Sequence, residues 1–296
     1  MEAVRLYREP ALRDPAFIAA WPGMGGVAII AAKHLKDKLG AEEFGRIEPY
    51  DFFDLGAISV RDHVVEEPEF PESKFYFWES GGGKDLIIFI GEAQPPVKGY
   101  RFANLVLDVA KRLRAKRVYT FAAAPGHIHH TRRPKVLGVT THPGLIEELR
   151  RNDVIPMGAG SISGLNGLLL GVAKERNMEG ICLLGEIPVY ITEIPNPRSS
   201  KAVLEVLTRF LAIEVDLSEL DNWAREAEAE IEKNIEMLRE SHGEEAKRLL
   251  DYFDRLKQQA SAEEAEIQEP LEFSTEELLG EVERFLKRTR EQEEGN

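Results

Sequence analysis

The sequence predicts an α/β fold, a three-layer α/β/α domain with a C-terminal helical appendage. Short continuous apolar runs recur along the first two thirds of the chain, and such runs are typical of strands covered on both faces. They lie at residues 17–21, 86–90, 118–122 and 181–184. Between them, apolar residues recur at helical spacing, as in residues 100–113. This alternation favours a layered domain with a largely parallel sheet.

Each element of the body follows from a local signal. Prolines and glycines mark the loops, and the spacing of apolar residues separates strands from helices. The expected strands are residues 17–21, 46–53, 76–78, 86–90, 118–122, 136–140 and 181–184. The expected helices are residues 27–39, 100–113, 164–175 and 199–213, with a short helix that begins near Thr141 and Pro143.

Charge divides the chain near residue 216. Residues 1–216 have a net charge of −1, whereas residues 217–296 carry −13 of the total of −14. Apolar stripes in this second part predict two helices, and a capping box at residues 274–277 predicts a third. We therefore expect an α/β domain over residues 1–216 and an acidic helical tail over residues 217–296. The tail glutamates form either a solvated outer face or an acidic arm for a basic partner.

Composition excludes several classes of partner and location. The acidic balance argues against nucleic acid, because a phosphate backbone is held by a basic surface. The single cysteine, Cys182, lies in an apolar run, so we expect a buried thiol in a reducing compartment. No signal segment opens the sequence and no apolar run approaches the ~18 residues that cross a bilayer. We expect a cytoplasmic protein without a membrane association.

Three glycines follow the first predicted strand. Gly23, Gly25 and Gly26 predict a tight loop that leads into the helix at residue 27, whose first N–H groups could hold an anion. The spacing differs from the dinucleotide fingerprint and from the phosphate-binding loop. The alternative is that these glycines only allow strand, loop and helix to pack closely.

This loop belongs to a stretch, Trp-Pro-Gly-Met-Gly-Gly-Val-Ala at residues 21–28, that resembles the opening motif of the PAC2 family, the family of proteasome assembly chaperone 2. Two later stretches, residues 89–96 and 158–170, support the resemblance, which covers about residues 12–213. It implies a core similar to purine nucleoside phosphorylases and related hydrolases. It also implies a non-catalytic assembly chaperone or scaffold, a homo-oligomer (trimer or larger) that acts on protein partners, with proteasome α subunits as the family's clients.

One feature departs from that family. Archaeal members that dock on the proteasome end in a hydrophobic residue, a tyrosine and any residue, whereas this sequence ends Glu294-Gly295-Asn296. We therefore expect no docking through such a tail.

Residues that could bind a ligand lie after several of the predicted strands. Gln94 and Arg132 lie in loops that leave strand ends, where open α/β sheets place ligands, and Asn166 opens a helix. The predicted ligand or anion site therefore consists of Gly23, Gly25, Gly26, Gln94, Arg132 and Asn166. The alternative function is thus an enzyme or binding protein for a phosphate-bearing or nucleoside-like molecule.

Few residues of the sequence point to metal binding or catalysis. His127 and His129 have a spacing compatible with two metal ligands, but a third is not evident, so we predict no metal site and no cofactor. The serines of residues 160–164 lack the register of a nucleophile elbow, so no catalytic residue is assigned.

Overall fold

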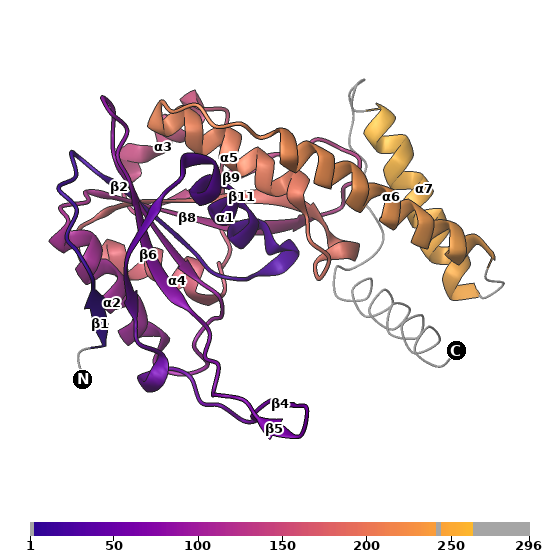
Figure 1. Cartoon of the computed structure of the whole chain (residues 1–296). Helices are drawn as coiled ribbons and strands as arrows, with labels where there is room; N and C mark the ends of the chain where they lie inside the picture. The colour runs from indigo at the N-terminus through magenta and orange to yellow at the C-terminus, as the bar shows by residue number, and fades with distance from the viewer. Residues whose placement is uncertain (1–2, 241–243, 263–296) are drawn as a thin grey trace.

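The computed structural model describes residues 3–240 and 244–262 and shows an α/β body with a pair of helices at one side (Figure 1). Its centre is a nine-stranded mixed sheet with the order β1-β3-β6-β7-β2-β8-β11-β9-β10. The strands are β1 (Val4–Leu6), β2 (Ala16–Ala20), β3 (Glu42–Ile47), β6 (Ser73–Trp78), β7 (Leu86–Gly91), β8 (Arg117–Gly126), β9 (Val136–Thr140), β10 (Ile155–Pro156) and β11 (Glu179–Pro188).

The expectation of a largely parallel sheet holds for the centre and for the edge pair of β9 and β10, but not for the other pairs. Strands β7, β2, β8 and β11 are parallel to their neighbours in that group, whereas β6 pairs antiparallel with β7 and β9 pairs antiparallel with β11. The link between β6 and β7 contains only residues 79–85. A parallel pair needs a crossover of a dozen or more residues, so this short link dictates an antiparallel pair.

Helices cover both faces of the sheet, as the sequence predicts. Helices α1 (Val27–Leu39), α3 (Ile146–Arg151) and α5 (Pro197–Leu211) share one apolar core with the sheet, and α2 (Gly99–Arg112) and α4 (Gly164–Glu175) share the other. Alternation within β2 divides its side chains between them, with Phe17 in one core and Ile18 in the other. Because β2 contributes to both cores, all five of its residues are buried.

The predicted strand at residues 46–53 is partly wrong. Strand β3 ends at Ile47, and a 3-10 helix, η2 (Pro49–Asp51), follows it. Proline has no N–H to donate to a strand ladder, and its φ suits a helical turn. The core still takes up this segment, since Phe52 and Phe53 after the turn are buried beside Phe102.

A helical hairpin forms the described part of the tail. Helix α6 (Ser218–Glu240) runs along α5 and then packs against α7 (Glu244–Ala262), and both project from one side of the body (Figure 1). Their apolar faces enclose the turn η4 (Val189–Ile191) in a separate small core. The third predicted helix lies outside the described residues.

A thin β-hairpin extends from the body on another side (Figure 1). It consists of β4 (Val60–Arg61) and β5 (Val64–Val65), and with residues 55–59 we call it the apolar arm. Its exposed apolar side chains are Leu55, Ile58, Val60, Val64 and Val65. Within residues 3–240 and 244–262 we find no helix with the length and apolar character of a bilayer-spanning segment.

Candidate functional site

A cavity of about 310 Å³ lies at the carboxyl ends of the central parallel strands. The chain leaves β2 for α1 on one face of the sheet and leaves the adjacent β7 for α2 on the other. Ligands of open α/β sheets bind at such a switch point. The lining residues are Gly23, Met24, Ala28, Gln94, Ala122, Ala123, Ala124, Pro125, Leu137, Met157, Ser161, Ile162, Ser163, Asn166 and Leu184.

The two amide side chains of this cavity hold backbone groups. Asn166 is buried, and its Oδ1 accepts a bond from the Trp21 N–H at 3.1 Å while its Nδ2 donates to the Trp21 carbonyl at 3.2 Å. Gln94 donates through Nε2 to the Pro22 carbonyl at 2.7 Å and accepts from the Leu165 N–H at 2.9 Å. Together they fasten the loop after β2 to the start of α4.

Backbone hydrogen bonds also hold the loop that contains Gly23, Gly25 and Gly26. Gly25 and Gly26 have φ of 61° and 59°, the left-handed region that glycine adopts without a Cβ clash. The Gly25 N–H donates to the Thr192 carbonyl at 2.5 Å, the Gly26 N–H to the Gly23 carbonyl at 2.9 Å, and the N–H of Val27 to a further carbonyl in the loop. These amides therefore already bond to backbone, and anion binding by them stays a prediction.

The structure brings only some of the six predicted site residues together. Gly23, Gln94 and Asn166 line the cavity, and Gly25 and Gly26 lie in the same loop outside its lining. Arg132 lies elsewhere, in the loop between β8 and β9, where its N–H donates to the His129 carbonyl at 3.0 Å.

The sequence interpretation missed one wall of the cavity. Ala122, Ala123 and Ala124 line it from the last residues of β8. A run of small residues at the carboxyl end of a predicted strand is the signal that could have revealed this wall, because small side chains leave room beside the sheet.

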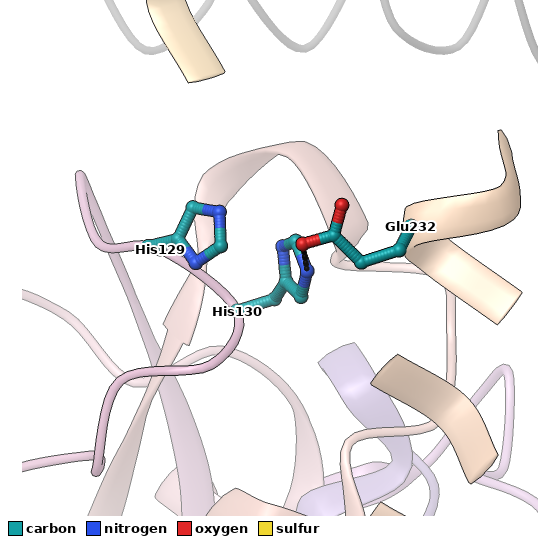
Figure 2. A group of neighbouring side chains, drawn as sticks. All are labelled: His129, His130 and Glu232. Atoms are coloured by element: carbon teal, nitrogen blue, oxygen red, sulfur yellow. Dashed lines mark ion pairs between the residues drawn. The ribbon is translucent and has the colours of Figure 1, made fainter. Parts of the chain in front are cut away.

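The histidine loop between β8 and β9 meets α6. Figure 2 shows His129 and His130 of this loop beside Glu232, whose carboxylate points toward the imidazoles. His130 Nε2 lies 3.3 Å from Glu232 Oε1, and the two imidazole centroids are 4.1 Å apart. His127, the residue that the sequence paired with His129, instead bonds through Nδ1 with the Tyr252 hydroxyl at 2.9 Å.

Burial keeps the two imidazoles neutral. It lowers the pKa of His130 to about 4, helped by the nearby His129, even though the Glu232 carboxylate acts in the opposite direction. Burial also lowers the pKa of His129. The contact between His130 and Glu232 is therefore not a strong ion pair at neutral pH, because desolvation of a 4% exposed ring outweighs a carboxylate that is partly solvated.

Comparison with known proteins identifies the family. The sequence model of the PAC2 family matches residues 17–235. The chain belongs to the PAC2 family. The match runs from β2 through the body and most of the way along α6.

Three proteins of known sequence or structure illustrate what this chain is similar to. The uncharacterized protein MJ1210 of Methanocaldococcus jannaschii is 31% identical over 225 residues, which are 75% of this chain and 83% of that protein. The crystal structure of Pyrococcus furiosus PbaB, an archaeal proteasome activator, is 32% identical with a TM-score of 0.68, over 78% of this chain and 97% of PbaB. Pyrococcus furiosus PbaA, an archaeal homolog of proteasome-assembly chaperone, shares the fold at 24% identity and a TM-score of 0.62, over 90% of this chain and 100% of PbaA.

The three stretches that resemble PAC2 motifs converge in space. Residues 21–28 contribute Gly23 and Met24 to the cavity, residues 89–96 contribute Gln94, and residues 158–170 contribute Asn166. The amide bonds described above connect the first stretch with the other two. In this PAC2 protein the three stretches therefore build one substructure at the end of the parallel strands.

Proposed function

We propose that this PAC2 protein is a non-catalytic chaperone or scaffold that acts in the cytoplasm on protein partners, as a homo-oligomer of three or more copies. The observation that carries the proposal is the apolar arm. Its side chains Val60, Val64 and Val65 are 64%, 67% and 62% exposed, and they gather on a hairpin that stands away from the body. Contiguous exposed apolar side chains are typical of protein contact surfaces.

Similarity to PbaB supports a partner from the proteasome. PbaB, at 32% identity over 97% of its length, is named a proteasome activator. We propose that the partners of this chain include proteasome subunits, with the α subunits as the first to test. At 24% identity, PbaA supports only the shared fold, so the choice of partner rests on PbaB.

Native mass spectrometry of the gently purified full chain tests both parts of the proposal. We expect an oligomer that carries a protein partner, and we expect a variant with Val60→Asp and Val64→Asp to lose the oligomer, the partner or both. Val97→Asp is the matched control, because Val97 is also an exposed valine, 52% exposed, outside the arm. A monomer without a partner, or an arm variant that behaves like wild type, contradicts the proposal.

A second candidate function rests on the cavity. We propose as the alternative that it binds a phosphate-bearing or nucleoside-like molecule, because its position at the switch point and its size suit a small ligand. A thermal-shift screen with inorganic phosphate and nucleosides tests this alternative. A rise in melting temperature that disappears in Asn166→Ala supports it, and no rise with any of these compounds rejects it.

A further inference from the structure

We infer that His129, His130 and Glu232 form a binding site for a divalent transition-metal ion, zinc being the first to test, which links α6 to the loop between β8 and β9. The inference is independent of the proposed function, since neither the cavity nor the apolar arm contributes a residue to it.

The side chains of two consecutive histidines converge with that of Glu232, which lies about a hundred residues later in the sequence. One ring nitrogen of each histidine and a carboxylate oxygen of Glu232 all lie within 4.8 Å of one another. Ligand atoms around a tetrahedral zinc ion with bonds of ~2.0–2.1 Å lie ~3.3 Å apart. His130 Nε2 and Glu232 Oε1, at 3.3 Å, already have that separation. A ring nitrogen of His129 lies within 4.8 Å of both atoms.

An unpartnered buried atom points to a ligand at this place. His130 is 4% exposed, and its Nε2 lies 3.3 Å from Glu232 Oε1 but, among the described residues, makes no hydrogen bond of good geometry. A buried polar atom without a partner is costly, and each such atom in a native protein requires an explanation. A metal ion between the three side chains would use this lone pair.

Each of the two rings makes a hydrogen bond with a neighbouring hydroxyl through Nδ1. His130 Nδ1 bonds with the Tyr190 hydroxyl at 2.9 Å, and His129 Nδ1 bonds with the Thr131 hydroxyl at 2.8 Å. Metal-binding histidines usually bond through the second ring nitrogen in this way, which sets the tautomer and leaves the other nitrogen for the metal.

The ligand set suggests the class of metal. Two imidazoles and one carboxylate suit zinc and other first-row divalent ions, and they leave a further coordination position for water. Two other charged groups lie near. Lys257 Nζ is 3.6 Å from Glu232 Oε1 and its side chain is 61% exposed, so it can move into solvent, while Glu228 adds negative potential near His129.

Such an ion would fasten the helical hairpin to the body. Glu232 lies on α6 between Ile231 and Ile235, which pack against the turn η4, and both histidines lie on a loop of the sheet. A bound metal ion should therefore stabilise the contact between α6 and the loop between β8 and β9, because binding to the folded state alone shifts the unfolding equilibrium.

The test uses the full chain, first treated with a chelator and then dialysed against zinc. We expect one zinc ion per chain by elemental analysis and a higher melting temperature with zinc than without. Glu232→Gln and His130→Gln should lose both effects. Tyr190→Phe, which removes only the hydroxyl that bonds with His130 Nδ1, should weaken zinc binding by about 10–100-fold.

Matched controls keep the result interpretable. Glu236→Gln removes the same charge one turn further along α6, where the side chain is 73% exposed, and His127→Gln removes the neighbouring histidine of the loop. Both should bind zinc like wild type. Failure of wild type to bind, or equal binding by Glu232→Gln, overturns the inference. Because Glu232 is partly exposed, its variant remains informative even if His130→Gln does not fold.

Discussion

Trp21 fits into the core because Gly91 has no side chain. A Cβ at position 91 would lie 2.5 Å from the Trp21 ring, which is fully buried and packs against Phe89 and Phe102. We expect Gly91→Ala to lower the free energy of unfolding by about 1–3 kcal/mol, since extra volume in a packed core forces side chains and backbone to shift. Denaturant unfolding measures this loss.

The control for that substitution is Gly82→Ala. A Cβ at Gly82 would meet no atom within 4 Å, so we expect a change within about 0.5 kcal/mol. Equal stability of the Gly91 and Gly82 variants would show that the ring can move aside at no cost.

Cys182 shows how burial controls reactivity at one residue. Its thiol is fully buried in β11, and burial raises its pKa to about 12. At pH 8 we expect a thiol reagent to label the folded chain at least about 1,000-fold more slowly than the unfolded chain, because the thiolate is the reactive form. The rate of labelling with and without denaturant checks this expectation. Fast labelling of the folded chain would mean that β11 opens readily.

Helix α6 is attached to the body by different contacts along its length. Near its start, Lys38 pairs with Glu219 at 2.5 Å and Lys201 pairs with Asp221 at 2.6 Å, and exposed pairs of this kind contribute little. Further along, Ile231 and Ile235 are buried against the turn η4. We therefore attribute most of the stability of the hairpin to the apolar contacts.

Ile231→Ala tests that attribution. Loss of a buried isoleucine costs about 2–5 kcal/mol, so we expect faster hydrogen exchange across α6 and α7. Exchange in β2 and β8 should change little, because their cores do not include Ile231. Glu230→Ala, at the exposed neighbouring position, should leave exchange as in wild type. Uniform acceleration over the whole chain would indicate that the hairpin and body unfold as one unit.

At the scale of the whole molecule, the hairpin covers apolar surface of the body. Val189, Tyr190 and Ile191 are 1%, 3% and 5% exposed, and their core consists largely of residues from α6 and α7. We expect a chain that ends at Asp216 to melt at a lower temperature and to bind more of a dye that detects exposed apolar surface. Differential scanning fluorimetry measures both.

The same shortened chain tests whether the tail joins the subunits of an oligomer. If residues 217–296 join the subunits, the shortened chain should form a smaller oligomer than the full chain. Unchanged oligomer size would assign the subunit contacts to the body and its apolar arm.

Much of the fold could be predicted because its signals are local. The glycines of residues 23–26 and the apolar spacing after them predict a helix at residues 27–39, and α1 has those bounds. The predicted helix at residues 164–175 also coincides with α4. The strand ends predict that the loops of Gly23, Gln94 and Arg132 share one rim, since parallel strands bring their carboxyl ends to one edge. Gly23 and Gln94 do line one cavity, but Arg132 does not.

By itself, then, the sequence determined the α/β class, the positions of most strands and helices, the PAC2 resemblance and the acidic character of the tail. Those properties depend on neighbours along the chain. Only the tertiary structure decided the antiparallel pairing of β9 with β11, the use of the Gln94 and Asn166 amides, and the meeting of His129 and His130 with Glu232. These depend on contacts between residues tens to more than a hundred positions apart, and side-chain direction at such contacts is set by packing, which no local pattern records.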